Sequence, residues 1–422
     1  MTTTQRQPKI LMLTLFPHSG NGSATVVRDL ATVLSPQAEC LVYYVDTEVT
    51  ETKDYRSHYL LVDDFPVLRT HPKSVQRKQF IQLSEKEITD YIQKLYEDFA
   101  SVVKEFHPDV IHVHHGWLGA TVAKRIKAEF GIPYIVQFHG TELEARHDYQ
   151  KANPQIMRFL DELVVDGLNS AEAFVAISPT EEELVLAYRK ELKLLPAVKM
   201  IPNGYDEDIF YPEAVDFEKL NAKFAKNLNG AKLDPAKPLV MFVGRFVGFK
   251  GIEHLIRAVP HFKSDVQTIL CGNGELFDKM VNLKDELKLE HVHFLGHVDH
   301  FDDLPALYNA ADMLIVPSEG EPFGLVAIEA MGCGTPVVGS MSGALPYILG
   351  YSGKEATGKT PYGVLVPYGD SPAIAEAIDS VVASDFKKKN ADAISQYVNK
   401  QFSVRAQAES YFSLYQDCNR SK

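Results

Sequence analysis

The chain has 422 residues, of which 45% are apolar and 23% are charged, a composition typical of a soluble globular protein with two or three domains. Its formal net charge of −13 argues against a nucleic acid partner and against general attraction to an anionic membrane. No apolar run reaches the ~18 residues of a membrane-spanning helix.

The opening residues and the cysteines indicate a compartment. Residues 1–6 lack the apolar core of a signal peptide. The four cysteines are scattered along the sequence without the spacing of metal ligands. We interpret them as reduced thiols and therefore expect a cytoplasmic protein.

The first half of the chain alternates strand-like apolar runs with helical stretches, and this alternation predicts a parallel sheet. An apolar run at 10–14 leads into a glycine turn at 20–22. Further runs lie at 109–114 and 134–138. We predict a first α/β domain over residues 1–203.

The second half repeats this pattern. Residues 203–237 are rich in Asp, Pro and Lys and predict a crossover between domains. A second sheet is predicted to open at 239–243, within a second domain over residues 204–403. Its further strands are predicted at 267–271, 291–295, 313–316 and 336–338. A final helix is predicted at 404–417.

Residues 318–339 form the most informative segment. Pro322 and Gly324 mark a turn between a buried strand and a helix over residues 325–331. Glu321 lies just before the helix, and Glu329 lies inside it. The positive end of a helix suits a phosphate, and carboxylates accept hydrogen bonds from hydroxyls, so a nucleotide sugar would fit. The alternative is that both glutamates are ordinary solvent-facing charges.

Two cations follow the predicted strand at 239–243. Ligands bind at the carboxyl ends of the strands in such sheets, and Arg245 and Lys250 lie just beyond this end. A guanidinium fork and a compact ammonium can both stabilise a leaving diphosphate. The alternative is a pair of surface cations.

Taken in order, these motifs resemble those of the retaining glycosyltransferases of family four. The two glutamates reproduce the E-x7-E segment of that family, and Arg245 with Lys250 resembles its phosphate-clamping pair. The other matching segments are 109–114 (central strand), 138–141 (histidine loop), 201–204 (hinge) and 272–274 (turn beside the base pocket). The resemblance implies the GT-B fold, which has two Rossmann-like domains facing across a cleft. It also implies that the helix at 404–417 packs back onto the first domain.

The resemblance implies roles for individual residues. The catalytic set is His139, Arg245, Lys250 and Glu321, with His139 reaching the transferred sugar from the first domain. The donor-binding set is Gly20, Gly22, Asn203, Gly274, Phe323, Gly324, Leu325, Val326 and Glu329. Similar enzymes retain the anomeric configuration by same-face attack, with the leaving phosphate helping to take the acceptor proton. We expect no cofactor and no metal, because the nucleotide sugar is a substrate and GT-B enzymes generally need no bound metal for chemistry.

Two other patterns suggest a metal. Residues 206–208 superficially resemble a metal-binding D-x-D, but they lie in the hinge, and we reject this reading. His112, His114 and His115 suggest a histidine cluster. The alternation of His112 and His114 along a strand favours an acceptor or packing role instead, with Trp117 as a sugar-stacking platform.

Residues 69–78 are basic in an acidic chain, and they suggest an acceptor-side loop for a phosphate or an anionic headgroup. A solvated loop is the alternative. The acceptor-binding set is Lys73, Arg77, Lys78, His114 and Trp117.

One departure concerns the donor site. The family often has a Gly-Gly pair followed by an acid, whereas Ala344 and Tyr347 stand in the second and third of these places here. The function expected is transfer of a hexosyl group, from a donor assumed to be UDP-linked, to a hydroxyl of a sugar, sugar phosphate or lipid-linked acceptor. Membrane contact is compatible with this function but not required, and the oligomeric state is left open. The alternatives are a non-catalytic sugar-nucleotide-binding protein and a GT-B isomerase or phosphorylase.

Overall fold

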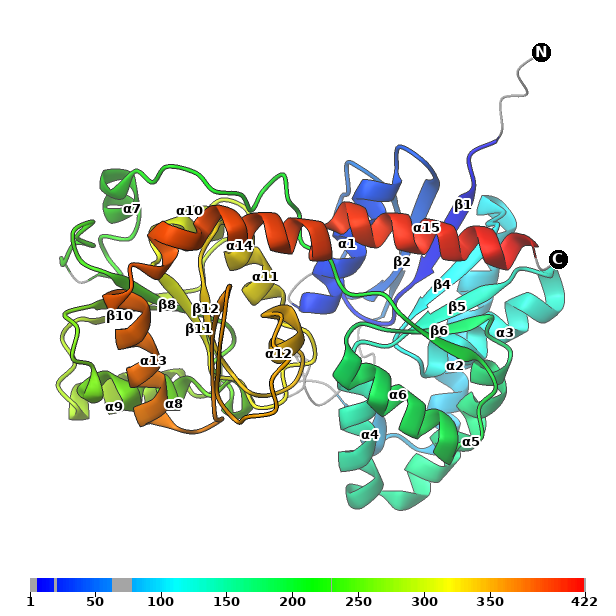
Figure 1. The fold of residues 1–422 in the computed structure, drawn as a ribbon. Helices are drawn as coiled ribbons and strands as arrows, with labels where there is room; N and C mark the ends of the chain where they lie inside the picture. The colour runs from blue at the N-terminus through cyan, green and yellow to red at the C-terminus, as the bar shows by residue number, and fades with distance from the viewer. Residues whose placement is uncertain (1–5, 19–20, 63–77, 229, 421–422) are drawn as a thin grey trace, which may run out of the picture. The chain divides into compact units, whose positions relative to one another are not determined.

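The computed structural model describes residues 6–18, 21–62, 78–228 and 230–420. The chain divides into two compact units, each built around one sheet (Figure 1). Unit 1 comprises residues 1–203 and 404–422, and unit 2 comprises residues 204–403. In the part of the chain that the structure describes, no helix combines the length and apolarity needed to cross a membrane.

The sheet of unit 1 has seven parallel strands in the order β3-β2-β1-β4-β5-β6-β7. These strands are β1 (Lys9–Leu13), β2 (Glu39–Asp46), β3 (Arg56–Leu61), β4 (Val110–His114), β5 (Tyr134–Gln137), β6 (Ala173–Ala176) and β7 (Ala197–Met200). Strand order reverses beside β1, whose neighbours are β2 and β4. In doubly wound sheets, ligands bind at such a reversal, at the carboxyl ends of the strands.

Helices cover both faces of this sheet, which explains why the central strand β1 is apolar on both sides. They are α1 (Gly22–Leu34), α2 (Glu85–Phe106), α3 (Leu118–Phe130), α4 (Thr141–Ala152), α5 (Pro154–Asn169), α6 (Pro179–Glu191) and α15 (Val404–Arg420), with a short 3-10 turn η1 (Phe80–Gln82). Along β1, Leu11 and Leu13 join the core under α2, α3 and α5, while Ile10 and Met12 join the core under α1 and α15.

The last helix, α15, belongs to unit 1. It packs against α1 and β4, so the C-terminal end of the chain closes one face of the first sheet (Figure 1). Its buried residues Tyr411, Leu414 and Tyr415 share a core with Ile10 and Met12. Because a sheet face needs apolar cover, this helix completes the first domain.

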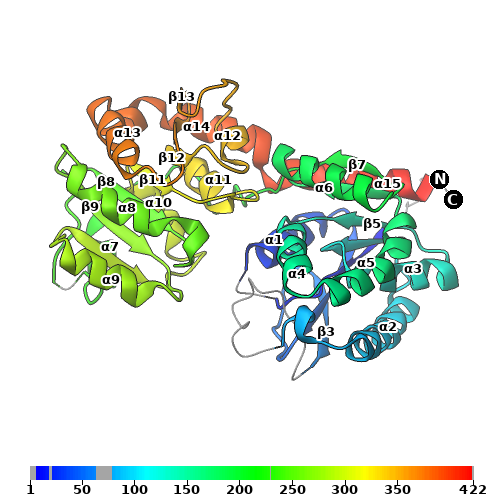
Figure 2. The same ribbon diagram turned by 90° about the horizontal axis from the view of Figure 1, so that it is seen from below.

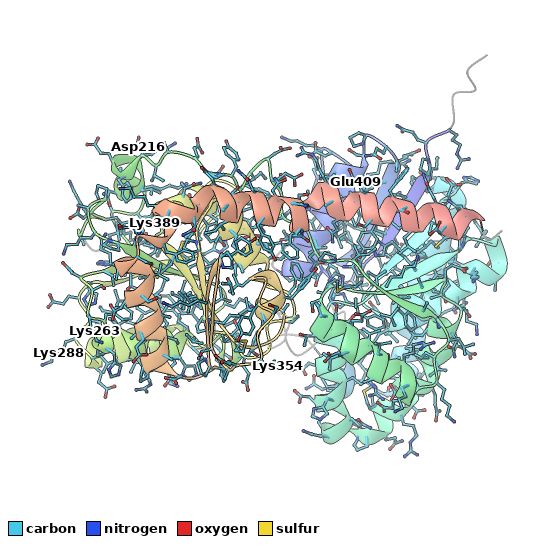
Figure 3. The ribbon with its side chains drawn as sticks, in the orientation of Figure 1. Asp216, Lys263, Lys288, Lys354, Lys389 and Glu409 are labelled. Carbon is cyan, nitrogen blue, oxygen red and sulfur yellow. The ribbon has the colours of Figure 1, made fainter. Side chains whose placement is uncertain are left out.

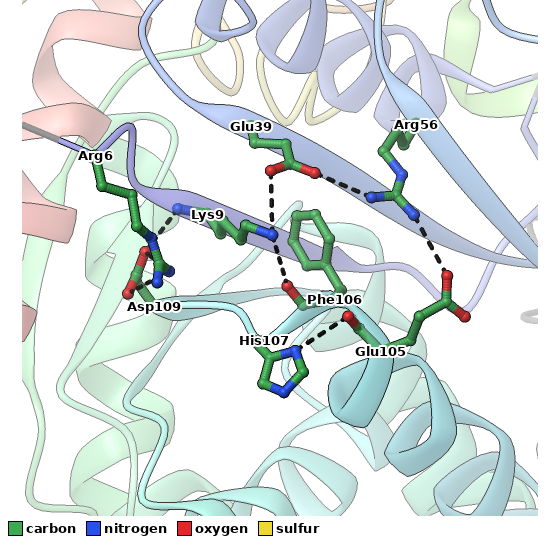
Figure 4. A network of polar contacts seen from close by, with 8 residues as sticks. All are labelled: Arg6, Lys9, Glu39, Arg56, Glu105, Phe106, His107 and Asp109. Carbon is green, nitrogen blue, oxygen red and sulfur yellow. Dashed lines mark hydrogen bonds and ion pairs between the residues drawn. The ribbon is translucent and has the colours of Figure 1, made fainter. Parts of the chain in front are cut away.

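Ion pairs close the amino-terminal edge of this sheet (Figure 4). Glu39, which begins β2, pairs with Lys9 of β1 at 3.2 Å and with Arg56 of β3 at 3.0 Å. Asp109 precedes β4, accepts a 2.8 Å hydrogen bond from the backbone N–H of Lys9 and pairs with Arg6 at 3.1 Å. The opposite edge carries the carboxyl ends of the strands, where the candidate site residues lie.

The sheet of unit 2 also has seven strands, in the order β10-β9-β8-β11-β12-β14-β13, and only the β13–β14 pair is antiparallel. The strands are β8 (Leu239–Val243), β9 (Gln267–Cys271), β10 (Val292–Gly296), β11 (Met313–Val316), β12 (Val337–Ser340), β13 (Gly358–Thr360) and β14 (Gly363–Val366). Strand order reverses beside β8, which lies between β9 and β11.

Helices cover this second sheet as well (Figure 2). They are α7 (Phe217–Lys223), α8 (Ile252–Ala258), α9 (Phe277–Glu286), α10 (Leu304–Ala310), α11 (Leu325–Gly332), α12 (Leu345–Ile348), α13 (Ser371–Ala383) and α14 (Phe386–Phe402), with 3-10 turns η2 (Gly248–Lys250) and η3 (Val259–His261). The core under α8, α9 and α13 includes Leu255, Met280 and Ile378. Helix α14 packs against α11. Charged side chains such as Lys263 and Lys354 stand on the surface of this unit (Figure 3).

The two alternating sheets confirm the expected α/β fold class, with two Rossmann-like domains. The strands predicted at 239–243, 267–271 and 313–316 have the observed bounds. Those predicted at 291–295 and 336–338 begin one residue later than expected, at Val292 and Val337. The hairpin of β13 and β14 was not predicted from the sequence.

Candidate functional site

The loops after β8 and β11 pack directly on each other in unit 2. Gly251 follows η2 in the left-handed region with φ +66°, and a Cβ there would lie 2.0 Å from the carbonyl oxygen of Pro317. Only glycine fits this approach. The backbone N–H of Glu319 donates to the Phe249 carbonyl at 2.7 Å and joins the same two loops.

This packing brings Lys250 to Glu321. Lys250 Nζ lies 2.7 Å from Glu321 Oε2, and the two side chains are 20% and 8% exposed. A charge-assisted hydrogen bond at this distance is strong, and the partial burial limits screening by solvent. The structure therefore brings two of the predicted catalytic residues together at the carboxyl edge of the second sheet.

A second loop holds the backbone of Glu321. Ala344 donates its N–H to the Glu321 carbonyl at 2.9 Å. Gly343 has φ +57°, and a Cβ there would lie 2.1 Å from the same carbonyl oxygen. The first glycine of the family's pair is thus required by space. At the second place Ala344 is buried and makes its contact through the backbone, so alanine is accommodated there.

Helix α11 starts beside this carboxylate. Its N-cap, Gly324, adopts a left-handed conformation with φ +105° and carries no capping side chain. The first N–H groups of the helix, including those of Leu325 and Val326, have no i−4 carbonyl within the helix and supply a positive end. Phe323, the residue before this N-cap, is buried and packs against Phe402. An anion would find backbone donors here, next to the Lys250 ammonium.

Glu329 lies inside α11 and is only 3% exposed. Its Oε2 accepts a hydrogen bond from the hydroxyl of Tyr308 at 3.2 Å. Its Oε1 lies 3.7 Å from Nε2 of His300. Burial, the largest cause, and the charge of Glu329, the second, raise the pKa of Tyr308 well above its ordinary value. The phenol therefore stays protonated and can donate its hydrogen bond.

Arg245 and Gly274 come from neighbouring loops of the same edge. Burial lowers the pKa of Arg245, and the charge of Glu275 opposes this shift. A Cβ on Gly274 would lie 2.6 Å from the carbonyl oxygen of Phe246, so the loop after β9 packs on the loop that carries Arg245.

The carboxyl edge of unit 1 carries a cluster of histidines. His139 follows β5 and is 5% exposed. Its Nε2 lies 3.1 Å from Nδ1 of His114, the last residue of β4, and the two nitrogens share a hydrogen bond. The backbone N–H of His139 donates to Glu142 Oε1 at 3.0 Å, and its ring stacks on His115 with centroids 4.6 Å apart.

The cluster extends inward to the C-terminal helix. Nδ1 of His112 hydrogen-bonds the hydroxyl of Tyr415 in α15 at 2.8 Å, and the His112 and His114 rings lie 4.0 Å apart. Burial lowers the pKa of His112 and of His115 to about 3. Burial, with the neighbouring histidines, also lowers the pKa values of His114 and His139 well below their ordinary value. All four imidazoles are therefore neutral near pH 7.

The remaining predicted residues of unit 1 take varied places. Asn203 is buried, and its Oδ1 accepts hydrogen bonds from Gln137 and Gln407, each at 3.4 Å. Gly22 begins α1, and Asn21 caps that helix through the Ala24 N–H. The donor-binding roles of Asn203 and Gly22 stay predictions.

The predicted acceptor set is only partly described. Gly20 of the donor set, and Lys73 and Arg77 of the acceptor set, lie outside the described residues. Lys78 pairs with Glu87 at 2.8 Å on the surface. Trp117 is 5% exposed and packs against Phe80 and Tyr149. These contacts support a packing role for the indole, and its sugar-stacking role stays a prediction.

Several residues that contact the candidate site residues were not predicted from the sequence. Tyr308, His300, Glu142 and Tyr415 contact predicted residues, yet no spacing signal points to them; Tyr415 stands 303 positions from His112. Within the described ranges no three His, Cys, Asp or Glu side chains are grouped as metal ligands. In the D-x-D segment, the side chain of Asp206 accepts a 2.9 Å hydrogen bond from the backbone N–H of Asp208, within a turn.

Comparisons with known proteins match both units. The model described as "Glycosyltransferase Family 4" matches residues 20–209, and that described as "Glycosyl transferases group 1" matches residues 224–401. An uncharacterised glycosyltransferase of Methanocaldococcus jannaschii is 30% identical over 249 residues, which are 57% of this chain and 60% of that protein. The D-inositol 3-phosphate glycosyltransferase of Corynebacterium jeikeium is 27% identical over 323 residues, which are 73% of this chain and 72% of that one.

Solved structures share the fold over nearly the whole chain. Sucrose-phosphate synthase from Thermosynechococcus elongatus superposes with a TM-score of 0.74 at 25% identity, over 98% of this chain and all of that one. This protein is a glycosyltransferase. The Anabaena protein HepE, in complex with UDP and glucose, shares the fold with a TM-score of 0.70 at 20% identity, over 97% of this chain and all of that one. The glycosyltransferase has the GT-B fold of these neighbours.

The buried histidines predict an acid-sensitive unit 1. An unfolded histidine takes up a proton below pH ~6.5, whereas folded His112 and His115 do so only near pH 3. The unfolded chain therefore binds more protons in this window, and the free energy of unfolding falls as the pH falls. The loss is about 2 kcal/mol per histidine at pH 5 relative to pH 7. Urea unfolding followed by the fluorescence of Trp117, the single tryptophan, reports on unit 1.

Matched variants isolate the effect. Both His115 and His107 have left-handed backbones, with φ 65° and 55°, which asparagine tolerates. His115→Asn should reduce the pH dependence by about one histidine's share. His107→Asn, at an exposed position, should leave the dependence unchanged. Equal pH dependence in the wild type and His115→Asn would contradict the assignment.

Proposed function

We propose that the protein is a retaining glycosyltransferase that moves a hexosyl group from a UDP-linked donor to a hydroxyl of its acceptor. The observation that carries this proposal is the Lys250–Glu321 ion pair beside the uncapped start of α11, with the buried Glu329 inside the same helix. A diphosphate flanked by two sugars would need a cation and a helix N-terminus for its charge, and carboxylates for the sugar hydroxyls.

The charges suggest how a donor would be held. The diphosphate would accept hydrogen bonds from the N–H groups that open α11 and from Lys250 and Arg245. Glu321 would then accept a hydrogen bond from the transferred sugar, and Glu329 from the ribose. These cations would stabilise the charge that grows on the diphosphate as it leaves, which is where electrostatic catalysis acts.

Transfer is proposed to occur on one face of the sugar. The bond between the anomeric carbon and the phosphate oxygen breaks, and a bond to the acceptor oxygen forms on the same face. The acceptor proton passes to the leaving phosphate. His139 is neutral, so its imidazole can donate or accept a hydrogen bond with a sugar hydroxyl without carrying a charge.

One relative suggests an acceptor class to test. The similar D-inositol 3-phosphate glycosyltransferase takes its name from a phosphorylated acceptor, and the basic residues 69–78 would suit one here. We therefore propose a sugar phosphate as the first acceptor class to test, ahead of neutral sugars and lipid-linked acceptors.

The experiment that tests the function is a thermal-shift screen of UDP-, ADP- and GDP-linked hexoses, followed by donor hydrolysis without acceptor. The UDP-linked hexoses are tested first, because HepE, which shares the fold, is in complex with UDP and glucose. A ligand that binds the folded state raises the melting temperature. A donor that stabilises the protein but is never cleaved would favour a non-catalytic binding protein.

Removing either cation should slow turnover. Lys250→Ala and Arg245→Ala are each expected to lower kcat by ~10²–10³-fold, the scale of losing one preorganised stabiliser. Lys354→Ala, which removes an exposed cation of the same unit, should leave kcat unchanged. Hydrolysis or transfer rates measure the effect, and near-normal turnover in both site variants would contradict the donor-site assignment.

The two glutamates should separate by role. Glu329→Gln is expected to weaken UDP binding by tenfold or more, since a hydrogen bond to a charged group contributes about 1.5–3 kcal/mol. Glu321→Gln should mainly lower transfer, because its carboxylate is proposed to hold the sugar. Calorimetry with UDP decides the order. Loss of UDP affinity in Glu321→Gln alone would mean that the two roles are reversed.

Transfer should need no metal ion. Arg245, Lys250 and the positive end of α11 can supply the charge that a divalent cation would otherwise provide. Activity is therefore expected to persist in excess EDTA, with the chelator-treated enzyme assayed again after Mg²⁺ or Mn²⁺ is restored. Complete loss that either metal reverses would overturn this part of the proposal.

A further inference from the structure

We infer that Tyr308 is a positioning residue for donor binding, because it fixes the carboxylate of Glu329 in the orientation that receives a ribose hydroxyl. This inference rests on the proposed donor-binding role of Glu329. Tyr308 itself is fully buried, so it acts through Glu329 and not by contact with the ligand.

The contact between the two side chains is direct. Tyr308 lies in α10 and Glu329 in α11, and the phenol hydroxyl donates to Oε2 at 3.2 Å. The phenol stays protonated because burial and the nearby carboxylate both oppose its ionisation. A phenol that stays protonated is suited to hold a carboxylate through a range of pH.

Tyr308 is itself held from the C-terminal end of α10. Lys387 in α14 donates from Nζ to the carbonyls of Asn309 at 2.7 Å and Ala311 at 2.6 Å, and more weakly to that of Tyr308 at 3.4 Å. The hydroxyl of Thr335 donates to the Tyr308 carbonyl at 2.6 Å. A cation suits this end of a helix, where carbonyl groups lack partners. Two further segments thus fix the backbone that carries the phenol.

The Glu329 carboxylate can accept more than one hydrogen bond at a time. A carboxylate offers about four acceptor positions on its two oxygens. Tyr308 takes one position on Oε2, and His300 Nε2 stands 3.7 Å from Oε1. Removing the Tyr308 donor would leave a buried carboxylate with less compensation and a freer side-chain torsion, so its acceptor positions would no longer be preset.

The test combines Tyr308→Phe with Glu329→Gln and measures the affinity for UDP by calorimetry, with ADP and GDP as alternative probes. Tyr308→Phe is expected to weaken binding by about tenfold. In the Glu329→Gln background, the same substitution should have little further effect, because the group it positions has already changed.

Deoxy analogues separate positioning from general loosening. With 2′-deoxy-UDP and 3′-deoxy-UDP, Tyr308→Phe should lose the same hydroxyl preference that Glu329→Gln loses. Tyr362→Phe is the control, because this half-buried tyrosine of unit 2 stacks on Tyr397 and its hydroxyl has no hydrogen bond among the described residues. It should leave both affinity and hydroxyl preference unchanged. Melting temperatures are measured for each variant.

The outcomes are distinguishable. If Glu329→Gln weakens UDP binding but Tyr308→Phe does not, the positioning role is overturned and the proposed function stands. Equal weakening of UDP and both deoxy analogues by Tyr308→Phe would show a merely structural role, which also overturns it. If Glu329→Gln binds normally, or if the wild type binds none of UDP, ADP and GDP, the donor-site assignment and the inference fall together.

Discussion

The contact of Gly251 with the carbonyl of Pro317 is the constraint on which the geometry of the second unit depends. No side chain fits between these backbones, and their closeness lets a lysine from the loop after β8 reach a glutamate from the loop after β11. Gly343 imposes a second close approach, on the backbone of Glu321 itself. The charged pair is therefore placed by backbone packing, which deforms little, and not by long flexible side chains alone.

The two units treat buried polar groups differently. Unit 2 keeps its charges as a compensated set in which Lys250 faces Glu321 and Glu329 receives a hydrogen bond from Tyr308. Unit 1 keeps its histidines neutral at the end of β4 and β5. Burying a charge without a partner is costly, so each solution avoids that penalty in its own way.

The sequence predicted what depends on local pattern. Apolar runs located β8, β9 and β11, and a glycine before an apolar helix located the start of α11. Partners that meet only in space escaped prediction. Tyr308 contacts Glu329, which is 21 residues away in the sequence, and Tyr415 contacts His112, which is 303 residues away. Neither separation corresponds to a helix or strand periodicity. Trp117 shows the opposite problem, because an aromatic residue beside a site-bearing strand can equally well belong to the core.

The departure at Ala344 illustrates how a motif separates into physical requirements. The family pattern has two glycines there, but the two positions do different things in this fold. Gly343 needs both a left-handed backbone and the absence of a Cβ, because that atom would collide with the carbonyl of Glu321. Ala344 contributes its N–H to the same carbonyl, and an alanine supplies that donor as well as a glycine does. The position that changed is therefore the one whose hydrogen bond to Glu321 comes from the backbone, and the support of Glu321 survives the change.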